Sequence, residues 1–157
     1  MHITDEQIAT YKEAGFLIIE NFLTKAEQQA ALDGFFSWFA PPYDVYIAAG
    51  RENETPKKFL FPWDHSGLNH VTAHPDLISA AERILQTRGI RLCEGHLGMK
   101  YAGGESKEWF HIDYGNNTLG PIMAPDDFMN LACFYCFDDV EEGMAPIQMV
   151  PNGYSDE

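Results

Sequence analysis

The order of its local patterns is the feature that most constrains how this chain can fold. Helix signals occur only within the first 89 residues, and most of the apolar segments typical of strands follow them. Capping boxes at Thr4 and Thr24, each with Gln or Glu three residues later, open two stretches with helical spacing. We expect the first helix to end at Gly15 and the second to end before Pro41-Pro42. The predicted apolar face of the second helix consists of Leu32, Phe35, Phe36 and Phe39.

A third helix is predicted to begin at Pro75 and to end at Gly89. His74 and Asp76 flank this proline, and a structural role at the start of the helix accounts for both, because an acidic side chain there is favoured by the helix dipole. Residues 43–73 show no clear period and are rich in Pro, Gly, Asn and aromatics. They are predicted to form a long loop.

Strands are predicted at residues 16–19, 90–101, 110–114, 128–137 and 147–150. The segment 128–137 is apolar almost throughout, which is typical of a strand buried on both faces. Helices followed by strands indicate an α+β fold, with one domain over residues 1–157 and N-terminal helices packed on a β-sandwich or barrel. A jelly roll has about eight strands, so we expect this β core to be incomplete.

Charge and composition exclude several classes of protein. The formal net charge is −14 and only 10 residues are Lys or Arg, which argues against nucleic acid as a partner. No apolar run reaches the roughly 18 residues of a membrane span. The acidic N-terminus lacks the pattern of a signal peptide, and three cysteines form an odd count. These features favour reduced thiols and a cytoplasmic location.

Two other groups of polar residues are weighed as metal sites. Cys133 and Cys136 have the C-x-x-C spacing, but residues three apart point to opposite faces of a strand and no second pair accompanies them. An acidic group lacks the ligand spacing and central Gly of an EF-hand, so we predict a solvated turn. It comprises Asp138, Asp139, Glu141 and Glu142.

The pattern His111-Ile112-Asp113 is the strongest candidate for a catalytic metal site in the sequence. Residues two apart on a strand point to the same face, so the imidazole and the carboxylate can converge on one ion. Two His and one carboxylate leave open positions on iron for a keto acid and O2, and this motif offers two of those three ligands. On pattern alone, an exposed strand-end pair that makes only hydrogen bonds is favoured over a metal site.

Five segments follow one another in the order found in a known enzyme family. They are residues 11–24, residues 74–77 before a helix, a strand ending at Lys100 that leads through a Gly-containing loop to His111 and Asp113, residues 134–140, and residues 143–153. This order resembles the phytanoyl-CoA dioxygenase family of non-haem Fe(II)- and 2-oxoglutarate-dependent oxygenases.

The resemblance implies a double-stranded β-helix core of the jelly-roll, cupin-like type. It implies Fe(II) bound by His111 and Asp113, with 2-oxoglutarate as cosubstrate. It places His96 at a keto-acid contact where relatives often carry Gln, and Lys100 on the same strand face. It aligns Phe134 with an aromatic that packs against the cofactor, although a plain core role is the alternative.

The implied activity is hydroxylation of a small or lipid-like organic substrate with O2. The family's third iron ligand is a later His, followed by an Arg for the keto acid, but no His follows His111 and no Arg follows Arg91. We therefore expect a C-terminally incomplete chain with little turnover by itself. The alternative is a truncated or catalytically inactive binding module. An unfinished sandwich would expose strand edges and invite self-association.

Overall fold

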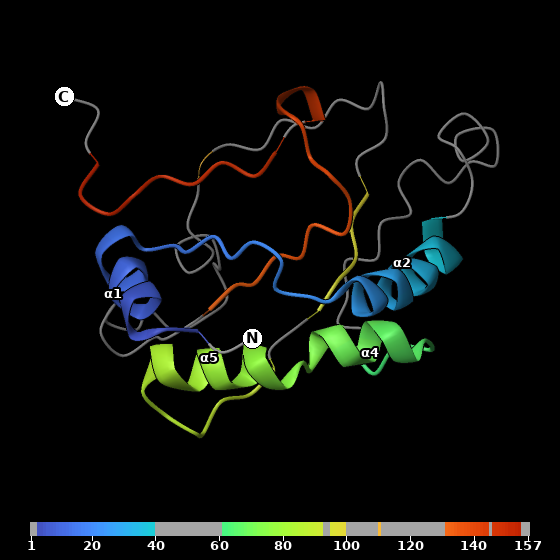
Figure 1. Ribbon diagram of the computed structural model, residues 1–157, viewed down its shortest axis with the longest axis horizontal. Helices are drawn as coiled ribbons and strands as arrows, with labels where there is room; N and C mark the ends of the chain where they lie inside the picture. The colour runs from blue at the N-terminus through green and yellow to red at the C-terminus, as the bar shows by residue number, and fades with distance from the viewer. Residues whose placement is uncertain are drawn as a thin grey trace, which may run out of the picture.

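The computed structural model describes residues 3–39, 61–92, 95–99, 110, 131–144 and 146–154. The helices of these residues are α1 (Asp5–Ala14), α2 (Lys25–Phe39), α4 (Ser66–Thr72), α5 (Pro75–Leu85) and the 3-10 turn η1 (Glu142–Met144). Figure 1 shows α4 and α5 following each other along one side of the molecule, with α2 against α4 and α1 near α5. Among the described residues, none of the helices combines the length and the apolar character needed to cross a bilayer.

Helix α1 confirms both of its predicted ends. The Gln7 N–H donates to Thr4 Oγ1 at 3.1 Å, and the Thr4 N–H donates to Gln7 Oε1 at 2.9 Å. Gly15 adopts a left-handed conformation (φ 83°) and its N–H donates to the Tyr11 carbonyl. The carbonyl of Ala14 accepts a hydrogen bond from the N–H of Asn152 at 2.9 Å. The end of α1 is therefore joined to a segment far along the sequence.

Helix α2 begins after Thr24 as predicted, and its predicted apolar face is buried in part. Phe39 is buried and Phe35 packs against the core, but Phe36 is 45% exposed. Ala31 and Gly34, which were not predicted, are also buried. The reason is the close approach of α4: a Cβ built on Gly67 would lie 2.1 Å from the Ala30 carbonyl oxygen. Small residues thus define the contact between α2 and α4, and the large aromatics flank it.

Helix α4 lies inside residues 43–73, where a loop without regular structure was predicted, so that prediction is wrong for residues 66–72. The helix is only seven residues long, too short for a period to stand out. Its start is capped by His65, whose Nδ1 accepts from the Gly67 N–H at 3.2 Å. Asn69 then holds the preceding segment, because its side chain accepts from the Trp63 N–H at 2.6 Å and donates to the Trp63 carbonyl at 2.7 Å.

Helix α5 starts at Pro75, as predicted, with His74 as its N-cap. It ends at Leu85, earlier than the predicted stop at Gly89. Gln86 takes the left-handed cap conformation (φ 53°), and its N–H donates to the Glu82 carbonyl. A non-glycine residue therefore makes the turn that the sequence pattern assigned to Gly89.

The predicted α+β jelly roll is wrong for the part of the chain that the structure describes, because that part is helical and contains no strand. The described portions of the five predicted strands all lack regular structure. An apolar run favours burial, but a strand also needs a second segment alongside it to complete the hydrogen-bond ladder. Here Leu97 lies in the buried core cluster, and Tyr135 and Phe137 pack against that cluster. Residues 131–144 and 146–154 run as a long connection that contains η1 (Figure 1).

The core lies where α2, α4 and the non-helical segments meet. Its buried residues are Ala31, Phe39, Trp63, Leu68, Val71 and Leu97. The segment that contains Phe137 is fixed to α2 by a hydrogen bond from Gln28 Nε2 to the Phe137 carbonyl at 2.8 Å. This packing brings the first turn of α2 close to the junction between α4 and α5.

Candidate functional site

The residues predicted from the sequence to hold iron and 2-oxoglutarate are only partly described. His111, Asp113 and Lys100 lie outside the described residues. His96 is exposed, and Phe134 is 56% exposed on the segment predicted as a buried strand. The strand prediction is wrong, while the assignment of these five residues to a site stays a prediction.

The two cysteines of the C-x-x-C pattern do not pair within the described residues. Cys133 and Cys136 are both free and exposed. The acidic residues that follow them are exposed and enter η1, and the Asp138 side chain accepts a hydrogen bond from the Asp139 N–H at 2.9 Å. This local hydrogen bond is typical of a turn.

A different cluster of possible metal ligands is present among the described residues. It consists of Glu27, His70 and His74, and one ligand atom from each lies within 4.8 Å of the others. Glu27 belongs to the first turn of α2, His70 to the last turn of α4, and His74 is the N-cap of α5. The cluster therefore stands where three helix ends meet, and we call it the Glu27 cluster.

The carboxylate of Glu27 receives hydrogen bonds on both oxygens. Oε1 lies 2.9 Å from His70 Nε2 and 3.3 Å from His74 Nε2. Oε2 accepts from the N–H of Thr24 at 2.8 Å and from its hydroxyl at 2.7 Å. The capping box that starts α2 thus fixes one oxygen and directs the other toward the two imidazoles.

His74 is the buried member of the cluster, with 6% of its surface exposed. Its ring lies 5.1 Å from the ring of Phe22 and 5.2 Å from the ring of His70, measured between centroids. Its Nδ1 accepts a hydrogen bond from the Asp76 N–H at 3.1 Å. In a neutral imidazole the other nitrogen then carries the proton, so His74 Nε2–H donates to Glu27.

The electrostatics of the cluster favour an ionised carboxylate. The pKa of Glu27 is lowered to about 2, first by the hydrogen bond from His70 and then by those from Thr24. The side chain of His70 is 48% exposed, whereas that of His74 is 8% exposed. A full negative charge thus faces one imidazole in contact with solvent and one that is buried.

Tyr135 lies beside the cluster and is connected to it through Phe22. The Phe22 ring is 6.0 Å from the Tyr135 ring and 5.1 Å from the His74 ring. Burial raises the pKa of the Tyr135 hydroxyl well above its usual value, with further contributions from Cys133 and Glu27. Among the described residues this buried hydroxyl has no hydrogen-bond partner.

The sequence contained a signal for two members of this cluster. His70 and His74 are separated by three residues, a spacing common among zinc ligands. Glu27 was identified as a capping residue, and only the packing of α2 on α4 brings it to the histidines.

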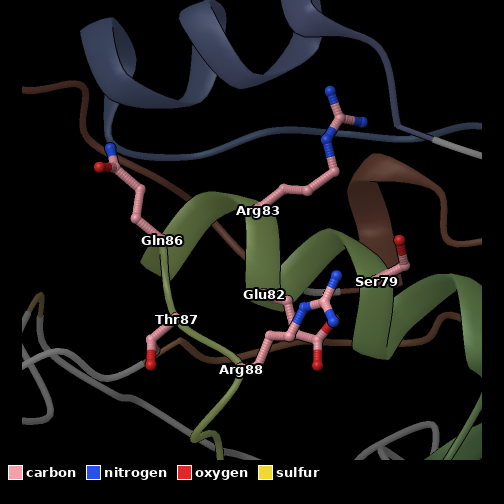
Figure 2. Close-up of a pocket in the computed structure, with 6 residues that line it drawn as sticks. All are labelled: Ser79, Glu82, Arg83, Gln86, Thr87 and Arg88. Carbon is pink, nitrogen blue, oxygen red and sulfur yellow. The ribbon is translucent and has the colours of Figure 1, made fainter.

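An open hollow along α5 also contains charged groups. Figure 2 shows the residues that line it: Ser79, Glu82, Arg83, Gln86, Thr87 and Arg88. Arg83 points out of the hollow toward α1 (Figure 2), where its guanidinium donates to the Ile3 carbonyl and pairs with Asp5. Its charge is thus engaged by α1, and we assign the hollow no ligand.

Two sets of residues are therefore candidates for the chemistry of this chain. The first is the pair His111 and Asp113, predicted from the sequence. The second is the Glu27 cluster, which three helix ends bring together. Comparison of the chain with protein-family models, with curated proteins and with solved structures gives no match.

Proposed function

We propose that this chain is part of an Fe(II)- and 2-oxoglutarate-dependent dioxygenase that hydroxylates a small or lipid-like organic substrate. One observation carries the proposal: the sequence places an imidazole and a carboxylate two residues apart, at His111 and Asp113, between flanking segments in the family's order. A His and carboxylate donor set with open positions suits Fe(II) oxygenases. The proposal rests on these residues and on their order, and it does not depend on a jelly-roll core.

Each residue has a distinct task in this proposal. His111 and Asp113 hold the metal, and bound iron supplies the chemistry of O2 activation. Lys100 offers a cation to a carboxylate of the keto acid, and His96 offers a hydrogen bond. Both His96 and Phe134 are exposed, which leaves them accessible to a ligand.

The test is O2-dependent conversion of 2-oxoglutarate to succinate by the protein produced from its complete reading frame. The His111→Ala and Asp113→Ala variants should each abolish succinate formation, because each removes an iron ligand. Matched controls are His65→Asn, which keeps a capping side chain at the start of α4, and Asp138→Ala in the exposed turn. Both controls should retain turnover.

Two outcomes contradict the proposal in different ways. Unchanged turnover in the His111→Ala or Asp113→Ala variant would refute the ligand assignment. Binding of Fe(II) and 2-oxoglutarate by the unsubstituted protein without any succinate would identify a binding module instead of an enzyme.

A further inference from the structure

We propose that the Glu27 cluster is a second metal site, separate from the His111 motif, which binds a divalent transition-metal ion of the zinc class through Glu27, His70 and His74. The inference does not rest on the oxygenase proposal, because the two sites share no residue. Two imidazoles and a carboxylate are a donor set that zinc uses in proteins, with water in the fourth position.

The distances between the donor atoms suit such an ion. Ligand bonds of roughly 2.0–2.1 Å in tetrahedral geometry place neighbouring donor atoms about 3.3 Å apart. Glu27 Oε1 lies 2.9 Å from His70 Nε2 and 3.3 Å from His74 Nε2. Both distances are close to this value, and the three donor atoms all lie within 4.8 Å of one another. The exposed His70 side leaves a route from solvent and room for the water ligand.

The surroundings hold two of the donors in place before an ion binds. Thr24 fixes Glu27 Oε2 with two hydrogen bonds, so that Oε1 stays directed at the imidazoles. Phe22 packs against the buried ring of His74. Outer contacts of this kind orient metal ligands and raise affinity in characterised sites. The negative charge of Glu27 adds attraction for a cation, and its hydrogen bonds among the described residues come from His70, His74 and Thr24.

Metal binding should change which ring nitrogen of His74 carries the proton. Its Nε2 now carries the proton that it donates to Glu27, because Nδ1 accepts from the Asp76 N–H. A metal ion needs the Nε2 lone pair, so the ring proton must transfer to Nδ1, and no proton is gained or lost overall. The hydrogen bond from the Asp76 N–H to His74 Nδ1 is then lost. Occupation of the site should therefore reduce the protection of this amide against hydrogen exchange at the start of α5.

The experiment uses a background in which His111→Ala and Asp113→Ala remove the other predicted metal ligands. Zn²⁺ is titrated by calorimetry, and Co²⁺ is added as a spectroscopic probe. We expect one ion per chain and the intense visible bands of four-coordinate Co²⁺, which Zn²⁺ should displace. Hydrogen exchange of the Asp76 amide, followed by NMR, should accelerate when Zn²⁺ binds.

Two variants separate a ligand role from a structural role. His70→Ala removes a half-exposed imidazole, so the fold should tolerate it. His74→Asn keeps an oxygen that can cap α5 but removes Nε2. Each should weaken Zn²⁺ binding by at least tenfold. The control is His65→Asn, since His65 caps α4 through Nδ1 in the same way but lies outside the cluster.

The result that overturns the inference is equally specific. Absence of 1:1 Zn²⁺ binding in the background protein, or equal affinity in the His70→Ala, His74→Asn and His65→Asn variants, would show that the cluster is only a hydrogen-bonded junction. Circular dichroism confirms that each variant is folded. Because the His111 motif is removed throughout, this outcome leaves the oxygenase proposal to its own test.

Discussion

Nε2 of His70 lies 2.9 Å from Oε1 of Glu27, although 43 residues separate the two in the sequence. Together with the contact from His74, this interaction joins the start of α2 to the end of α4 and the start of α5. The same three side chains are thus both a structural connection between helices and a set of metal donors. Substitutions and pH changes near this junction should show how much these side chains contribute to the stability of the fold.

Acid should weaken the fold through Glu27. Its pKa in the folded protein is about 2, below the ordinary value of 4.5, because His70 and Thr24 donate hydrogen bonds to the carboxylate. A lowered pKa in the folded state stabilises the protein above pH 4.5, and the stabilisation is lost as the pH falls toward 2. Unfolding midpoints measured across this interval should fall more steeply for the unsubstituted protein than for the Glu27→Gln variant. Parallel curves would contradict the assignment.

The cap of α5 should depend on an acceptor at position 74 and not on an imidazole. His74→Ala removes the Nδ1 acceptor of the hydrogen bond from the Asp76 N–H, whereas His74→Asn supplies a new acceptor. We expect the Ala variant to be about 1 kcal/mol less stable than the Asn variant in urea unfolding. The same two substitutions at His96, which is exposed and caps no helix, should differ little from each other. Equal stability of the two position-74 variants would rule out the cap.

Gly67 should not tolerate a methyl group. Alanine normally improves a helix by about 1 kcal/mol over glycine, but here the added Cβ would lie 2.1 Å from the Ala30 carbonyl oxygen. Because backbone cannot yield without moving α2 from α4, we expect Gly67→Ala to lower the free energy of unfolding by about 1–3 kcal/mol. Gly143→Ala is the control, since nothing lies within 4 Å of its Cβ position. A stabilised Gly67→Ala protein would mean that the two helices are farther apart.

Removal of the Tyr135 hydroxyl should stabilise the protein. The hydroxyl is buried without a hydrogen-bond partner among the described residues. Leaving a buried polar group unpaired costs about 1–3 kcal/mol, so Tyr135→Phe should raise the free energy of unfolding by about 1 kcal/mol. Tyr154→Phe, at a tyrosine that is 65% exposed, should change little. A destabilised Tyr135→Phe variant would reveal a partner for this hydroxyl.

The helix starts could be predicted because their signals are local. Thr4 and Thr24 are followed at the right spacing by a side chain that returns the hydrogen bond, and Pro75 suits a first turn. Helix ends were less predictable, since Gln86 adopts the left-handed conformation before the glycine at position 89 is reached. Local chemistry thus predicted where these helices begin, and it predicted the end of α1 at Gly15 but not the end of α5.

Features that depend on contacts between distant segments could not be predicted. The buried face of α2 follows from the fit of Gly67 against Ala30, and nothing in the spacing of its phenylalanines indicates this. Apolar runs such as residues 131–137 predicted strands, but a strand requires a neighbouring segment for its ladder. The Glu27 cluster was missed for the same reason. The spacing of His70 and His74 is visible in the sequence, but Glu27 reaches them only through the packing of α2 on α4.

The hydrogen bond between the Asn152 N–H and the Ala14 carbonyl bears on how the chain is made. Helix α1 leaves the ribosome long before residue 152, and its cap at Thr4 needs only neighbours that are already present. The acceptor at its other end finds its partner only after residue 152 has been synthesised. Helix α1 is therefore completed by a residue made much later, and a chain released before that point carries α1 with an unanchored end.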